Sequence, residues 1–243
     1  MREAGSTEPI ASVMGQALGQ DDHRWQAFAA AIGQAWPAQP GPDSSQPGPD
    51  RSPDRFLAFD PDQLFVFAAI DSTNRALWQR SQGSQAVDSG CGGPPTLRPG
   101  AIAIALEQTA GRGQWGRTWQ SAPGGLYLSL YIEPDLAPQN AAQLTLAAAW
   151  GVATSLGDRG VAVQVKWPND LLLSGRKLGG ILTETRLSQG KIRRAVIGLG
   201  LNWQNPTPDT GITLATDPAC PFTSLSDLAG AAIAGLVRGD RQL

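Results

Sequence analysis

The sequence has very few of the side chains on which many catalytic and structural sites depend. Its 243 residues include two cysteines and a single histidine, His23. Two cysteines are too few for a disulfide framework or a zinc site built from cysteine. One histidine excludes a catalytic triad and most metal hydrolases, unless His23 is itself the central residue. A disulfide scaffold and a histidine-dependent enzyme are therefore not expected.

Long hydrophobic runs are missing as well. A helix that spans a bilayer needs roughly 20 apolar residues, and the best stretch, residues 141–157, is interrupted by glutamine, threonine and glycine. The first residues, Met1-Arg2-Glu3, are followed by no apolar signal core. We therefore expect a soluble cytoplasmic protein with no membrane partner, in which Cys91 and Cys220 are reduced.

Lysine is scarce, and charge is unevenly distributed. The sequence contains sixteen arginines but only three lysines, Lys166, Lys177 and Lys191, and its net charge is −2. Residues 101–204 hold ten basic and six acidic residues, a balance of +4, whereas the rest holds nine and fifteen, or −6. This distribution indicates a small anionic ligand more than a nucleic acid, for which the whole domain would normally be basic. Lysine kept at these few places would indicate positions that need a compact ammonium rather than a planar guanidinium, but codon bias is the favoured explanation of the lysine count.

Residues 1–60 differ in composition from the remainder and are predicted to be an appendage. Residues 21–36 have apolar side chains at helical spacing and predict one helix. Residues 37–55 contain eight prolines or glycines among nineteen residues, which is typical of an extended linker. A single helix does not make a helix-turn-helix DNA reader, so no nucleic-acid partner is expected. The organised domain is predicted over 61–243.

This domain is predicted to be α+β. Helices are expected to begin at Ser72 or Thr73 and run to about Arg80, and over 138–156 and 224–237. Strands are expected over 64–70, 101–107, 126–132, 161–167, 171–173, 178–187 and 192–203. Short turns between consecutive strands indicate antiparallel pairing. The pattern predicts a mixed, largely antiparallel sheet with helices on one face.

A glycine-rich loop occupies residues 108–125. Gly111 to Gly116 matches the spacing G-x-G-x-x-G, and Glu133 follows at a suitable distance. A dinucleotide site requires a helix after the last glycine, but Pro123 and two glycines lead here into a strand. Glycines that admit an anion, with Arg112 and Arg117 between them, indicate instead a flap that closes over an anionic ligand. A solvated hairpin loop is the alternative.

Two of the three lysines lie in or beside turns that follow the loop. Lys166-Trp167-Pro168-Asn169-Asp170 ends a valine-rich stretch, and Lys177 precedes Gly179-Gly180. A lysine at the end of a buried strand needs an anionic partner, which a ligand carboxylate or phosphate would supply. Alternatively, Pro-Asn-Asp is an ordinary hairpin turn and Lys166 extends to the surface.

Six blocks of the sequence form a recognisable series: Asp71-Ser72-Thr73-Asn74, Gln108-Thr109-Ala110-Gly111-Arg112-Gly113 with Gly116-Arg117 and Trp119, Gly125-Leu126-Tyr127-Leu128-Ser129, Lys166 to Asp170, Lys177-Leu178-Gly179-Gly180-Ile181 and Gly198-Leu199-Gly200-Leu201-Asn202. With these blocks, which follow the family's order, the sequence resembles the biotin–protein ligases, in particular the monofunctional type without a DNA-binding domain. The resemblance implies a catalytic domain like those of biotin ligases and class II aminoacyl-tRNA synthetases.

It also implies a two-step reaction. Biotin attacks the α-phosphate of MgATP, which gives biotinyl-5′-AMP and pyrophosphate, and the anhydride is captured by one lysine of the biotin carboxyl carrier protein of acetyl-CoA carboxylase. Two anions must meet, so cations must offset their repulsion, and a closed loop must keep water from the adenylate. A weak homodimer is compatible with this interpretation.

The resemblance assigns roles to individual residues. Biotin and its adenylate would be bound by Ser72, Thr73, Asn74, Gln108, Arg112, Gly113, Gln114 and Lys166. ATP would be contacted by Arg117, Trp119, Asn169, Asp170, Lys177 and Asn202. Lys166 and Arg112 would be catalytic, and no dedicated metal site is expected. Ser72-Thr73-Asn74 is also a plain helix cap, and both roles are compatible.

The chain departs from the family pattern in two places. Gln114-Trp115 stands where many members have Arg-Arg, which removes one loop cation and is expected to loosen retention of the adenylate. We also expect the small C-terminal β-barrel of larger members to be absent. Two alternatives stay open: a lipoate or octanoate ligase or transferase of similar fold, whose pattern includes a histidine that is missing here, and a non-catalytic protein that binds biotin or its adenylate.

Overall fold

A computed structural model describes Ala30, residues 61–83 and residues 97–243. The helix predicted over 21–36 and the linker predicted over 37–55 lie outside these residues, apart from Ala30, which is helical. His23 and Cys91 also lie outside them. Of the described helices, none combines the length and the apolar character that crossing a membrane requires.

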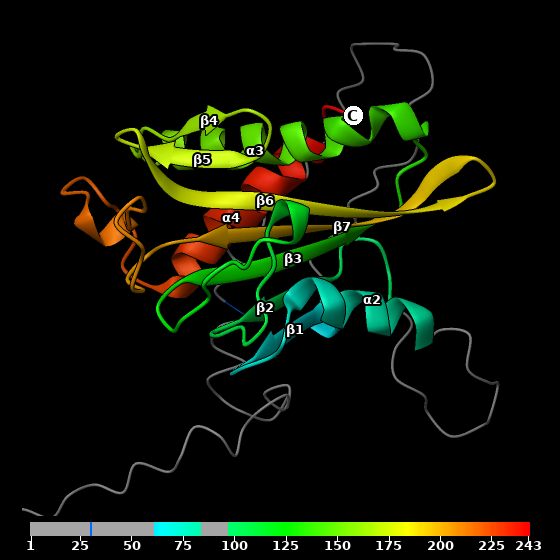
Figure 1. The fold of residues 1–243 in the computed structure, drawn as a ribbon, viewed down its shortest axis with the longest axis horizontal. Coiled ribbons are helices and arrows are strands. Elements are labelled where there is room, and N and C mark those ends of the chain that lie inside the picture. Colours follow the sequence, from blue (N-terminus) through cyan, green and yellow to red (C-terminus); the bar gives the residue numbers. More distant parts are fainter. Residues whose placement is uncertain (1–29, 31–60, 84–96) are drawn as a thin grey trace, which may run out of the picture.

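In the part of the chain that the structure describes, seven strands form one sheet in the order β1-β2-β3-β7-β6-β5-β4 (Figure 1). Within the described residues, its strands are β1 (Leu64–Phe67), β2 (Ile102–Ala105), β3 (Leu126–Ile132), β4 (Gln164–Lys166), β5 (Asp170–Leu173), β6 (Arg176–Ser188) and β7 (Lys191–Leu201). β1 and β2 are parallel, and each later neighbouring pair is antiparallel. The mixed, largely antiparallel α+β fold predicted from the sequence is therefore confirmed.

Two tight turns explain why the last strands pair as hairpins. Ser174 and Gly175, between β5 and β6, have φ angles of 50° and 75°. Gln189 and Gly190, between β6 and β7, have φ angles of 51° and 75°. Two successive residues with positive φ match the right-handed twist of the flanking strands, and this favours two-residue hairpin connections. The hairpins fold β6 alongside both of its neighbours.

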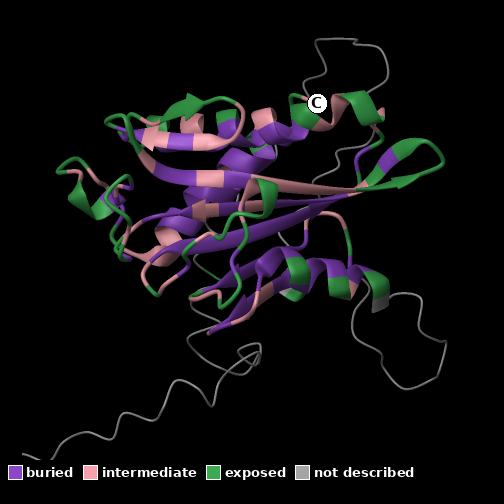
Figure 2. Ribbon diagram, viewed as in Figure 1, coloured by how far each residue is buried: buried purple, intermediate pink, exposed green. Residues whose placement is uncertain are grey.

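Helices cover both faces of the sheet. α3 (Ala141–Asp158) and α4 (Leu225–Asp240) pack on one face, against the larger hydrophobic core. α2 (Thr73–Gly83) packs on the opposite face, where Leu77 and Trp78 meet the alanines of β2 and Tyr131 of β3. The expectation that helices cover one face holds for α3 and α4 but is wrong for α2. Figure 2 shows that β2 and β3, which lie between these layers, are buried along their whole length.

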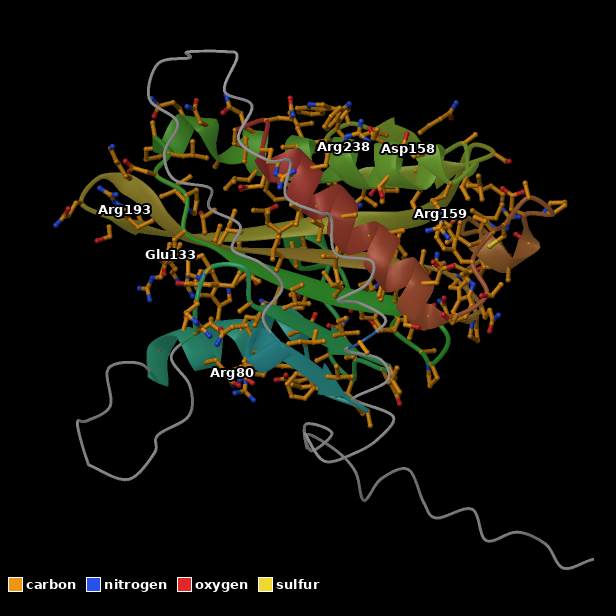
Figure 3. All side chains as sticks on the ribbon, turned by 180° about the vertical axis from the view of Figure 1, so that it is seen from behind. Arg80, Glu133, Asp158, Arg159, Arg193 and Arg238 are labelled. Carbon is orange, nitrogen blue, oxygen red and sulfur yellow. The ribbon has the colours of Figure 1, made fainter. Side chains whose placement is uncertain are left out.

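The contact between α3 and α4 depends on glycine. Gly151 of α3 faces Gly235 of α4, and a Cβ atom on Gly235 would lie 2.6 Å from the Cα atom of Val152. Ser224 caps α4 by accepting a hydrogen bond from the Asp227 backbone N–H at 3.1 Å. At the solvent side the two helices are joined by an ion pair (Figure 3), in which Arg238 lies 2.7 Å from Asp158. The paired helices back the sheet and leave its other face for a site.

Candidate active site

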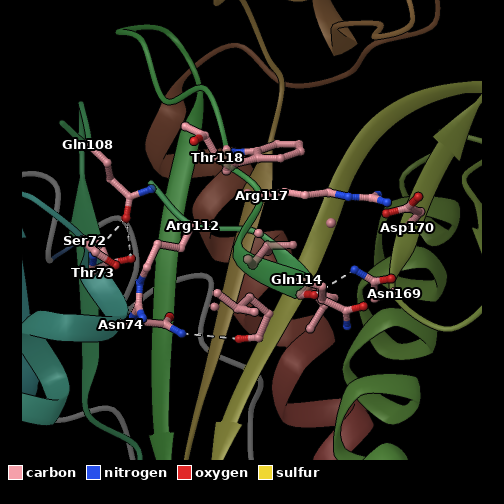
Figure 4. Close-up of a pocket in the computed structure, with 18 of the residues that line it drawn as sticks. Ser72, Thr73, Asn74, Gln108, Arg112, Gln114, Arg117, Thr118, Asn169 and Asp170 are labelled. Carbon is pink, nitrogen blue, oxygen red and sulfur yellow. Dashed lines mark hydrogen bonds between the residues drawn. The ribbon is translucent and has the colours of Figure 1, made fainter. Parts of the chain in front are cut away.

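A cavity of about 280 Å³ lies on the face of the sheet that carries α2 (Figure 4). It is lined by the start of α2, by β3, β6 and β7, by the turn before β5 and by the hairpin formed by residues 108–121. Residues 108–121 are called the flap below. The cavity thus lies where segments far apart in the sequence converge.

One end of the cavity is neutral, polar and buried. Ser72, Thr73 and Asn74 are 5%, 3% and 3% exposed. The backbone N–H and the Oγ1 hydroxyl of Thr73 both donate to Oε1 of Gln108, at 2.9 and 3.1 Å. The Ser129 hydroxyl oxygen lies 2.7 Å from Thr73 Oγ1 and 2.6 Å from Asn74 Oδ1. These contacts fix amide and hydroxyl groups that suit an uncharged ligand with donors and acceptors of its own.

The flap is a hairpin closed by its own backbone bonds. Gln108 donates to the Ser121 carbonyl at 3.0 Å, and Gly113 donates to the Arg117 carbonyl at 2.7 Å. A side chain on Gly111 would collide with Ser121 and with the Trp119 carbonyl, so only glycine allows the two sides to approach this closely. At the tip, η3 (Gln114–Gly116) contains Trp115 at a φ of 59°. Trp115 is 91% exposed.

The other end of the cavity is charged. Lys177 Nζ lies 2.6 Å from Asp170 Oδ1 and 5.5 Å from the ring centre of Trp119. The Arg117 side chain extends from the flap toward Asp170 (Figure 4). Asn169 donates through Nδ2 to the Ile181 carbonyl at 3.1 Å. The residues at this end provide two cations, one carboxylate and one amide, a set that suits an anion with a polar edge.

Glycines of β7 form the part of the floor between the two ends. A Cβ atom on Gly198 would collide with the Asn74 amide, and one on Gly200 would collide with the Trp119 indole. Side chains alternate along a strand, so both glycines face the cavity. Their lack of side chains allows α2 and the flap to lie close to the sheet.

Arg112 links the flap to the sheet through Glu184 of β6. Its NH2 nitrogen donates to Glu184 Oε2 at 3.0 Å, and the Asn74 amide donates to the same oxygen at 2.8 Å. Sequence reasoning missed Glu184. A usable signal was present, because Gly180, Leu182 and Glu184 share one face of β6 and Glu184 is the charged member of that series.

Most of the residues selected from the sequence lie around this cavity. Those among its lining residues are Ser72, Thr73, Asn74, Gln108, Arg112, Gly113, Gln114, Arg117, Trp119, Asn169, Asp170 and Lys177. Lys166 does not line the cavity, because it ends the exposed strand β4 at the edge of the sheet. Asn202 does not line it either. It is 5% exposed and donates to the Lys177 carbonyl at 3.4 Å, so it contacts the backbone of β6 rather than the cavity.

Among the described residues, no three His, Cys, Asp or Glu side chains group as metal ligands.

The fold thus forms one cavity with a neutral and a charged end. Residues 66–202 match the Biotin/lipoate A/B protein ligase family, and the chain belongs to this family. The family resemblance inferred from the sequence is thereby confirmed.

Named relatives and solved structures agree with this assignment. The chain is 39% identical over 146 residues to the bifunctional ligase/repressor BirA of Bacillus subtilis, which covers 57% of this chain and 43% of that protein. It is 36% identical over 143 residues to the biotin–[acetyl-CoA-carboxylase] ligase of Paracoccus denitrificans, with coverage of 57% and 58%. The chain spans about half the length of these relatives. The biotin protein ligase of Aquifex aeolicus, solved with biotin and ATP, superposes with a TM-score of 0.55 at 25% identity, with coverage of 74% and 70%.

Proposed function

We propose that this domain activates biotin with MgATP and transfers the biotinyl group to the ε-amine of a lysine on a biotin carboxyl carrier protein. The observation that carries the proposal is the two-ended cavity, in which a buried neutral end and a cationic end lie under a flap that bears arginine. Membership of the ligase family and likeness to a structure solved with biotin and ATP support the same reaction.

The neutral end is assigned to the ureido ring of biotin. A ureido group has two N–H donors and one carbonyl acceptor, and it carries no charge. Ser72, Thr73, Asn74 and Gln108 offer hydroxyl and amide partners of both kinds. Because these groups are nearly buried, an unmatched ligand would leave them without hydrogen bonds, and this penalty gives selectivity.

The charged end is assigned to the chemical step. A carboxylate oxygen of biotin forms a bond to the α-phosphorus of ATP, and the bond from that phosphorus to the pyrophosphate oxygen breaks. Both reactants are anions, so preorganised cations lower the barrier most where the charge gathers. We assign to Lys177 the role that the sequence gave to Lys166, because Lys177 lines the cavity. Arg112, Gly113 and Gln114 would then wrap the carboxyl and phosphate from the flap.

ATP would enter as its magnesium complex, so the metal would arrive with the substrate. Arg117, Asn169 and Asp170 are the proposed contacts for its phosphates and metal, since carboxylate and amide oxygens are typical magnesium ligands. Trp119 lies beside Lys177 and would present a ring face to the nucleotide. The flap would exclude water from the biotinyl-5′-AMP until the carrier lysine attacks its carbonyl carbon and AMP leaves.

One assay tests the proposal. Purified protein is incubated with MgATP, a biotin carboxyl carrier domain, and either biotin or lipoate. The mass of the carrier domain is then measured by mass spectrometry. We expect a gain of one biotinyl group with biotin, and no gain without ATP or with a carrier that lacks its acceptor lysine. A lipoyl gain, or pyrophosphate release without transfer, would contradict the proposal.

A further inference from the structure

One carboxylate oxygen joins three separate parts of the cavity wall. Oε2 of Glu184 accepts a hydrogen bond from Arg112 of the flap at 3.0 Å and another from Asn74 of α2 at 2.8 Å. Glu184 itself lies on β6, and its partners are 72 and 110 positions away in the sequence. Because both donors share one acceptor atom, the flap and the start of α2 are fixed relative to each other.

The orientation of the Asn74 amide is set by groups on both of its sides. Its nitrogen donates to Glu184 and to the Leu182 carbonyl, at 2.8 and 3.4 Å, and its oxygen lies 2.6 Å from the Ser129 hydroxyl. An amide with donors and acceptors both engaged has one favourable orientation. Glu184 therefore helps to determine how the amide nitrogen and oxygen of Asn74 are oriented toward a ligand.

The ion pair between Arg112 and Glu184 also neutralises a carboxylate beside the cavity. The Glu184 side chain is 27% exposed, and an unpaired carboxylate beside the cavity would repel an anionic ligand. The guanidinium of Arg112 neutralises it through the NH2 nitrogen alone. The Nε and NH1 groups lie outside this hydrogen bond and are available as donors to an anion.

We infer that Glu184 is a positioning residue, which holds the Arg112 guanidinium and the Asn74 amide in the geometry that the adenylation step uses. The inference rests on the proposed function for its chemical part. Its structural part, that Glu184 anchors the flap through Arg112, stands on the contacts above and is tested without any ligand.

The first measurement is hydrogen exchange of the unliganded protein. We expect Glu184→Gln to raise the exchange rate of flap amides, among them those of Gly113 and Trp119, by about tenfold, because a charge-assisted bond to Arg112 is lost. Asp135→Asn is the matched control. Asp135 also pairs with an arginine, Arg193 at 3.0 Å, but away from the cavity. Unchanged flap exchange in Glu184→Gln would overturn the inference.

The second measurement is a double-mutant cycle on biotin-dependent exchange of pyrophosphate into ATP. We expect Glu184→Gln to lower the turnover rate by about tenfold in the wild-type background and by only about threefold in the Arg112→Ala background, where its contact with Asn74 is all that it still contributes. Asp135→Asn should change neither rate. An equal loss in both backgrounds would show that Glu184 does not act through Arg112 and would overturn the inference.

The two measurements separate the inference from the proposed function. If wild-type protein catalyses no exchange of pyrophosphate, the proposed function fails, and hydrogen exchange alone decides whether Glu184 anchors the flap. If wild-type protein is active while Glu184→Gln has normal flap exchange and normal turnover, the proposed function stands and the positioning role is wrong.

Discussion

Nζ of Lys177 lies 2.6 Å from Oδ1 of Asp170, and both side chains line the cavity. The ammonium therefore has a partner built into the fold before any ligand arrives. An incoming carboxylate or phosphate would meet a cation already oriented by Asp170 and by the face of Trp119, 5.5 Å away. Preorganisation of this kind is what electrostatic stabilisation of a transition state requires.

The first prediction compares the two lysines. Lys177→Ala should lower the rate of biotin adenylation by at least about 100-fold, the usual cost of removing a preorganised donor. Lys166→Ala should lower it by less than about threefold, because an exposed cation at the sheet edge acts only through screened long-range charge. Biotin-dependent pyrophosphate exchange measures both. A larger loss in Lys166→Ala than in Lys177→Ala would return the catalytic role to Lys166.

Lys166, to which the sequence assigned a catalytic role, lies outside the lining of the cavity in the structure. The turn at 166–170 was identified correctly, and Asn169 and Asp170 do line the cavity. Lys166 lies opposite Asp170 in the ladder between β4 and β5. However, β4 is the edge strand, one strand farther from the cavity than β5. Strand order is set by the packing of the whole sheet, and the residues around Lys166 do not specify it.

The other features of the fold and the site also differ in whether they depend on neighbouring residues or on contacts between distant segments. The strands, the flap and the polar start of α2 were predictable, because each depends on neighbouring residue types. The placement of α2 on the second face was not predicted, although β2 gave a signal. All four of its residues are buried, and a strand buried on both sides must be covered on both sides. Glu184 was missed because its partners are 72 and 110 positions away.

The second prediction concerns the glycine floor of the cavity. Gly198→Ala should weaken biotin binding by at least about tenfold, because the new methyl group collides with the Asn74 amide and displaces it from Glu184 and Ser129. Isothermal titration with biotin measures the affinity, and thermal unfolding checks that the variant is folded. Unchanged affinity would exclude a role for the Asn74 amide in binding the ureido ring.

The third prediction concerns stability away from the cavity. Gly235→Ala should lower the free energy of unfolding by about 1–3 kcal/mol, because its methyl group overpacks the α3–α4 contact near Val152 and Gly151. Gly157→Ala in α3 is the matched control. It meets nothing within 4 Å and should stabilise the protein by about 0.5 kcal/mol. Urea unfolding measures both. Equal effects would show that helix propensity, rather than close packing, governs these positions.

The fourth prediction concerns alkaline pH. The chain has two tyrosines, and the side chains of both are buried in the structure. Burial, followed by the charge of Glu107, raises the pKa of Tyr127 above its ordinary value of 10.0. Burial, followed by the hydrogen bond to Glu133 at 2.6 Å, raises the pKa of Tyr131 as well. Each tyrosine is therefore kept neutral by the folded state.

The sign of the pH effect follows from these shifts. Unfolded tyrosines release their protons near pH 10.0, whereas the folded ones hold them, so their contribution to stability is complete below that pH and is lost as the pH rises toward the folded pKa. Each tyrosine should lower the unfolding free energy by about 1.4 kcal/mol per pH unit in this window. Tyr131→Phe should halve the slope in urea unfolding, and tyrosinate absorbance should appear only as the protein unfolds. Tyrosinate absorbance near pH 10.0 in protein that is still folded would contradict the raised pKa values.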